Sequence, residues 1–177
     1  DIFHESVPDK WIAAVWSAMH KARKHIFLVL TKRSRRMRDF FQRELTLFSD
    51  SVLENVQMGI SVWDQESADR MIPDLLATPA AVRMIPDLLA TPAAVRWISV
   101  EPMLDRVDLE IPKAIAWYPG VDWVVCGAET GPGARPMDLD WARDLRNQCA
   151  ADGVPFWFKK DSQGRHTLDG KVHEERP

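Results

Sequence analysis

The sequence has few cysteines, a single tyrosine and no long apolar segment. Its two cysteines, Cys126 and Cys149, are too few for a framework of disulfide bonds. No run of about 18 apolar residues occurs, and the first residues lack the basic and apolar regions of a secretory signal. These absences argue against a secreted disulfide-rich protein and against a membrane span. They predict a cytoplasmic protein with no membrane partner.

The sequence also lacks a strong net charge. Its 23 lysines and arginines nearly balance 26 aspartates and glutamates, so the overall charge does not favour a nucleic-acid partner. A hydrophobic content of 46% and a charged content of 28% are typical of a globular protein. We therefore expect a single β/α domain over residues 1–177. Because the chain starts at aspartate rather than methionine, we also expect it to be part of a longer protein.

The pattern of apolar residues predicts an α/β fold. Short apolar runs rich in β-branched residues predict strands at 25–31, 56–62, 96–101, 122–127 and 154–159. Apolar residues at helical spacing predict helices between them, at 8–24, 35–48, 65–76 and 140–151. Nearly all-apolar strands that alternate with helices imply parallel pairing. Either an open doubly wound sheet or a partial (β/α) TIM-like barrel fits this order, and periodicity alone does not separate them.

A thirteen-residue segment occurs twice without a single change. Residues 71–83 (MIPDLLATPAAVR) are repeated as residues 84–96. Solenoid repeats differ between copies and need about three units, so we interpret the pair as a tandem duplication. We expect the second copy to form an extra short helix with no functional role, because a surface insertion of this size costs little loop entropy.

Polar residues follow the predicted strands, where parallel β/α folds bind their ligands. The candidate catalytic residues are Glu101, Glu129 and Lys159. The candidate cofactor-binding residues are Lys32, Ser61 and Arg135. We expect these six side chains to meet at one edge of the sheet.

Each candidate also has a purely structural interpretation. Glu101 either contacts a ligand or forms an ion pair with Lys32 or Lys159. Glu129 either belongs to the site or is a plain loop carboxylate. The segment 131–135 (GPGAR) matches neither a phosphate-binding loop nor a dinucleotide fingerprint. Arg135 could still bind a carboxylate or phosphate through two nitrogens.

A basic stretch between Lys32 and Arg43 gives a second candidate surface. It includes Arg35, Arg36 and Arg38, interleaved with apolar residues at helical spacing. Such a pattern is typical of a helix with a solvated basic face, and contact with a nucleic-acid backbone is the alternative.

Eight tryptophans are many for a chain of this length. The pattern predicts burial of five of them, Trp11, Trp16, Trp97, Trp123 and Trp157. Trp63 and Trp141, near the starts of predicted elements, could line a pocket. The histidines lack the spacing of metal ligands, so no metal site is predicted.

Several segments together resemble the phage gene-product 37/68 family. They include residues 1–5 (DIFHE), 27–33 (FLVLTKR), 59–62 (GISV), 99–104 (SVEPML), 129–137 (ETGPGARPM) and 153–159 (GVPFWFK). The chain departs from that family at Ala128, where a glycine is usual, and after Lys159, where it has Lys160-Asp161 and Gln-Trp-Gly is usual.

The resemblance implies the C-terminal portion of a radical-SAM-like barrel. Such proteins hold a [4Fe–4S] cluster and S-adenosylmethionine, the cluster on an N-terminal three-cysteine motif that these 177 residues do not contain. The chain alone is then expected to be inactive, with Glu101 and Glu129 orienting cofactor or substrate in the full-length protein. Two alternatives stay open: a two-carboxylate hydrolase using the same glutamates, and a noncatalytic nucleic-acid-binding protein. The substrate is not predicted.

Overall fold

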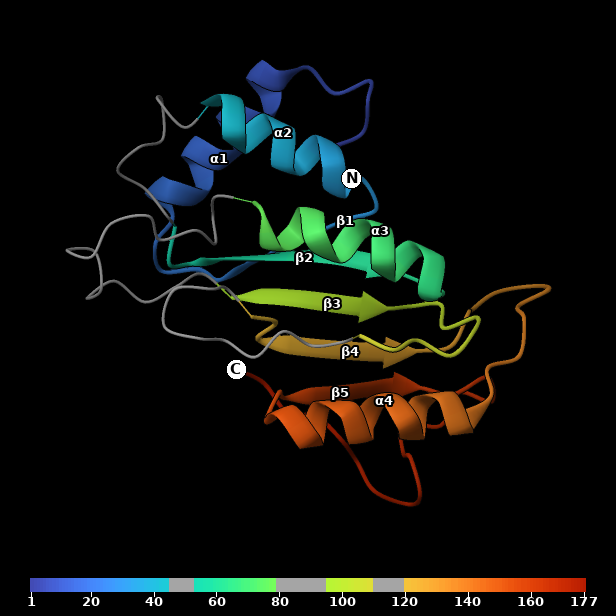
Figure 1. The fold of residues 1–177 in the computed structure, drawn as a ribbon. Coiled ribbons are helices and arrows are strands. Elements are labelled where there is room, and N and C mark those ends of the chain that lie inside the picture. Colours follow the sequence, from blue (N-terminus) through green and yellow to red (C-terminus); the bar gives the residue numbers. More distant parts are fainter. Residues whose placement is uncertain (45–52, 79–94, 110–119) are drawn as a thin grey trace.

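The computed structural model describes residues 1–44, 53–78, 95–109 and 120–177 (Figure 1). The elements are α1 (Asp9–Lys21), β1 (Phe27–Thr31), α2 (Ser34–Glu44), β2 (Val56–Val62), α3 (Gln65–Leu76), β3 (Arg96–Val100), β4 (Trp123–Gly127), α4 (Leu139–Asp152) and β5 (Phe156–Lys160). The extra helix expected in the second copy of the repeat and the end of the helix expected at 35–48 lie outside the described residues. No helix among the described residues is long and apolar enough to cross a membrane.

The five strands form one parallel sheet in the order β1-β2-β3-β4-β5, which confirms the predicted α/β class. Their arrowheads all point the same way in Figure 1. Each strand pairs with the next one along the chain, for example Gly59 with Trp97 and Trp97 with Trp123. A doubly wound sheet reverses its strand order at a switch point. This sheet has no such reversal over the described strands.

One face of the sheet packs against the helices. The main apolar core combines alternate strand residues, such as Val29, Ile98 and Phe158, with residues from all four described helices. The other face carries a separate cluster of Trp97, Trp123 and Val125, with Trp157 packed against it. Side chains alternate along each strand, so these residues point away from the main core. The buried apolar residues of the four described helices belong to the main core and not to this cluster, so we call the second face helix-free.

Helix ends follow from local sequence in most cases. Asp64 and Ser67 form a capping box at the start of α3. Gly153 ends α4 in the left-handed conformation (φ 69°), as its position predicts. At the start of α1, Pro8 occupies the N-cap and no side-chain cap bond forms.

One expectation about burial also needs correction. Trp11 is 60% exposed on α1, because that helix turns Ile12 and Trp16 towards the core instead. The first residues of the chain form a turn. Phe3 is nevertheless fully buried, edge-on to Phe40 of α2.

Candidate functional site

The carboxyl ends of β1, β2, β3 and β4 surround a hollow of about 390 Å³. Four of the six predicted site residues line it: Lys32, Ser61, Glu101 and Glu129. The other two, Lys159 and Arg135, each form an ion pair with one of its glutamates. The structure therefore brings all six residues together. The parallel register explains this, since it ends the strands at a common edge.

Glu101 forms the ion pair that its structural interpretation predicts. Lys159 Nζ lies 2.7 Å from Glu101 Oε2, and the two side chains are 47% and 23% exposed. Gly127 makes room for this carboxylate, because a Cβ there would lie 3.2 Å from Glu101 Oε1. Ser61 Oγ donates a hydrogen bond to the backbone oxygen of Glu101 (3.1 Å). The ion pair is therefore partly exposed and accessible to a ligand, while Lys159 and Ser61 hold Glu101 in position.

Glu129 is held by Arg135 across the glycine-rich turn. Arg135 Nε and Nη2 donate to the two carboxylate oxygens at 2.8 and 2.7 Å, and its backbone N–H donates to Oε2 at 2.8 Å. Gly131 and Gly133 allow this turn, with φ values of 108° and 77°. The side-chain hydrogen bonds from Arg135 lower the pKa of Glu129 to about 2. Arg135 therefore binds a carboxylate through two nitrogens, as its chemistry allows, but this carboxylate is Glu129 of the same chain.

The Glu129–Arg135 pair should survive mild acid. A carboxylate whose pKa is lower in the folded state contributes stability above its unfolded pKa and loses it only as the pH falls through the folded value. Because the folded pKa is about 2, we expect Glu129 to remain ionised at pH 3. The side-chain carboxyl ¹³C shift measured against pH tests this. In the R135Q variant the midpoint should return towards about 4.3, and an unchanged midpoint would contradict the assignment.

Lys32 reaches the same edge from β1. Its Nζ lies 5.6 Å from the centre of the Trp63 ring, and it forms no ion pair with any described residue. Trp63, predicted to line a pocket, is thus next to the site, but it packs against the main core and lines neither hollow described here. Trp141, the other tryptophan predicted to line a pocket, packs against that core too and lines neither hollow described here.

A second hollow of about 510 Å³ continues along the helix-free face of the sheet. Trp97, Trp123 and Trp157 line it, together with Glu101 and Lys159. Sequence reasoning placed these tryptophans in the core and missed their common face. The sequence did contain evidence for this common face. Residues two or four apart in a strand point to the same side of the sheet, which places Trp97 with Glu101 and Trp157 with Lys159.

The two cysteines do not suit an iron–sulfur cluster. Both are buried, Cys126 in β4 with its thiol donating to Met103 Sδ (3.5 Å) and Cys149 in α4. Burial raises the pKa of the Cys126 thiol and raises that of Cys149 to about 12, which disfavours the thiolates that ligate iron. Over the described ranges, no three His, Cys, Asp or Glu side chains cluster as metal ligands.

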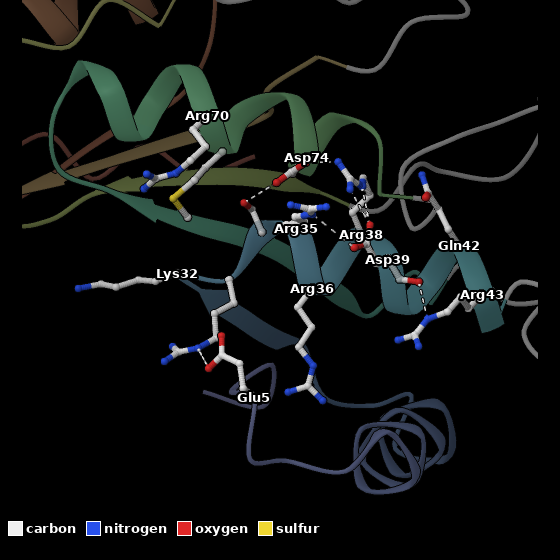
Figure 2. Close-up of a pocket in the computed structure, with 13 residues that line it drawn as sticks. Glu5, Lys32, Arg35, Arg36, Arg38, Asp39, Gln42, Arg43, Arg70 and Asp74 are labelled. Carbon is white, nitrogen blue, oxygen red and sulfur yellow. Dashed lines mark hydrogen bonds and ion pairs between the residues drawn. The ribbon is translucent and has the colours of Figure 1, made fainter.

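The basic face of α2 is largely neutralised by nearby groups (Figure 2). Arg36 donates to the backbone oxygens of Phe3, His4 and Val7 and to the Asp9 carboxylate. Arg38 pairs with Asp39 and Asp74. Arg35 is 83% exposed, with only a 3.8 Å contact to Asp39. Of the three arginines expected to contact nucleic acid, two therefore hold the fold together.

One comparison with known proteins gives a match. A family model described as "Protein of unknown function (DUF5131)" matches residues 1–86 and 83–177. The two matched segments overlap where the first copy of the thirteen-residue repeat ends and the second begins. No curated protein and no solved structure matches the chain.

Proposed function

The chain belongs to the family of proteins of unknown function DUF5131, and we propose that it forms the ligand-binding C-terminal part of a radical-SAM-type β/α barrel. The observation that carries this proposal is the common hollow at the carboxyl ends of the strands. There Lys32, Ser61, Glu101 and Glu129 meet on the edge where β/α barrels bind their ligands.

The arrangement of the sheet supports the barrel. Strands that pair in chain order, with all four described helices on one face, form the wall of a (β/α) barrel when the sheet curves. The helix-free face then lines the interior. The polar strand ends and the tryptophans of that face would both point towards a bound ligand.

The chemistry of the strand ends suits S-adenosylmethionine, which carries an ammonium, a carboxylate and a sulfonium. Glu101 can accept a hydrogen bond from the ammonium, and Lys32 can donate to the carboxylate. In this proposal the cluster would be held by a segment outside this chain, and cluster and cofactor together would supply the hydrogen abstraction there. This chain would bind and orient the reactants.

The two alternatives receive less support from the geometry. A two-carboxylate hydrolase needs one carboxyl group with a raised pKa to act as an acid. Both candidate glutamates are ion-paired instead, and the pKa of Glu129 is lowered to about 2. A nucleic-acid role for the basic helix receives less support because Arg36 and Arg38 already bind carboxylates within the protein.

Iron content of the whole gene product tests the proposal. Expressed anaerobically with iron and sulfide, the full-length protein should be brown, with about four irons per chain. It should bind S-adenosylmethionine, and the E101Q variant should bind it at least about tenfold more weakly with unchanged iron content. The matched control is E66Q, at an exposed position of α3. A colourless, iron-free protein, or equal binding by E101Q and wild type, would contradict the proposal.

A further inference from the structure

The two hollows form one continuous trough on the helix-free face of the sheet. They share Leu30, Ser99 and Glu101. Polar strand-end residues line the end of the trough at the carboxyl edge, and tryptophans line the other end. Ser99 is 2% exposed and lines both hollows. A ligand in this trough would therefore meet an aromatic surface and polar groups at the same time.

The aromatic end of the trough is built from three tryptophans in fixed positions. The rings of Trp97 and Trp123 are 5.4 Å apart, and Trp123 and Trp157 are 6.1 Å apart and nearly perpendicular. Trp123 Nε1 donates to the backbone oxygen of Glu175 (2.8 Å). Trp97 and Trp123 are 7% and 8% exposed, whereas Trp157 is only partly buried. Trp157 is therefore the ring that a ligand can reach.

A planar cation already lies on this ring. The guanidinium carbon of Arg176 is 4.7 Å from the centre of Trp157, and Arg176 lines the same hollow. Lys159 lies two residues along β5 on the same face, about 7 Å further towards the carboxyl edge. Two cations therefore lie near the accessible Trp157 ring: Arg176 stacks on it, and Lys159 lies beyond its edge.

The charges of the trough favour an anionic ligand. Three of its charged side chains are cations, Lys32, Lys159 and Arg176, and two are carboxylates. Glu101 pairs with Lys159, and Glu129 pairs with Arg135, which lines neither hollow, so these carboxylates leave Lys32 and Arg176 uncompensated. The positive charge that is left over would attract an anion into a site with an aromatic wall.

We propose that the trough binds a flat aromatic ring that carries an anionic group. The 4.7 Å between Arg176 and Trp157 is too short to admit a ring, so the exposed Arg176 side chain moves outward on binding. The ring then lies between the indole and the guanidinium, and the carboxylate or phosphate binds Lys159. Arginine and tryptophan both stack on flat rings, so the ring is held on two sides. The inference rests on the proposed function only in taking this ligand to be the substrate of the barrel.

Calorimetric titration of the whole protein tests this inference. The probes are adenosine 5′-monophosphate and, separately, indole-3-acetate, because the anion can be a phosphate or a carboxylate. At least one should bind, while adenosine and inorganic phosphate, which each lack one of the two features, should bind at least about tenfold more weakly. Which probe binds more tightly identifies the source of the anion.

Variants locate the binding site. W157L, K159Q and R176Q should each weaken binding of the better probe at least about tenfold. The matched controls are W11L and K10Q on α1, which should bind like wild type. Because Lys159 and Arg176 are exposed, their replacement leaves the fold intact even where W157L destabilises it, and circular dichroism checks each variant.

Three results would overturn the inference: no binding of either probe, equal binding of adenosine and its monophosphate, or site variants that bind like W11L. A protein that binds the probes but holds no iron would overturn the proposed function alone. An iron-loaded protein that binds neither probe would overturn this inference alone.

Discussion

Replacing Asp74 by alanine should lower the free energy of unfolding by about 3 kcal/mol, because the change removes a buried carboxylate that joins two helices. Asp74 lies in α3 and accepts hydrogen bonds from Ser34 Oγ (2.8 Å) and from Arg38, both in α2. Ser34 is 4% exposed, so its hydroxyl would lose its partner inside the protein. Arg38 is 28% exposed and can turn to water, which keeps the effect below the full cost of an unpaired buried charge. Urea unfolding followed by circular dichroism measures the change.

Asp69 provides the matched control for this prediction. It lies in the same helix, but it is exposed and its carboxylate binds only the side chain of Gln65 among the described residues. The D69A variant should lose less than about 0.5 kcal/mol. Equal losses in D74A and D69A would show that the contact between α2 and α3 does not depend on the buried carboxylate.

Replacing Gly59 by alanine should cost about 1–3 kcal/mol, since the added methyl group overpacks the helix-free face. A Cβ at this position would lie 2.4 Å from the nearest atom of the Trp97 ring. Gly59 is in the middle of β2, paired with Leu30 on one side and Trp97 on the other, so the strand cannot move away. The indole would have to leave its place beside Trp123. Unfolding in urea gives the loss of stability.

A double-variant cycle with W97L separates this clash from a general loss of strand stability. Leucine is smaller than the indole, so alanine at position 59 should cost much less when Trp97 is already leucine. If G59A costs the same in both backgrounds, contact with Trp97 is not the cause.

The sequence predicts most of the sheet because its strands are short, apolar and bounded by polar residues. The strand at 56–62 and the helix at 65–76 have the predicted bounds, and the other described strands begin up to two residues later or end one residue away. The strand at 25–31 begins late because His25 is still in the turn after α1, where its N–H bonds to Ala22. The order of the strands was not predictable, because periodicity reports burial and not neighbours.

The strand-end residues of the site were predictable for a geometric reason. Parallel strands share one carboxyl edge, so polar residues that follow separate strands meet there. Their pairing was not predictable. Lys32 follows β1 and Lys159 lies in β5, and both strands are two places from β3, so strand order does not decide between them. Gly127, on the strand between Glu101 and Lys159, has no side chain to separate that pair. The common face of the tryptophans was missed because strong hydrophobicity indicates burial without indicating the side of the sheet.

The two edges of the sheet differ in their capacity to add strands. Residues 173–175 run antiparallel to β5 and bond to it, with Phe158 N–H donating to His173 and Glu175 N–H donating to Phe156. β1 is at the other edge, and no described strand pairs with its outer side. Another strand can thus add at β1 without displacing a described strand, whereas at β5 it would have to displace residues 173–175. Edge-to-edge growth into fibres needs two open edges on each molecule. With one edge closed, such association ends at pairs.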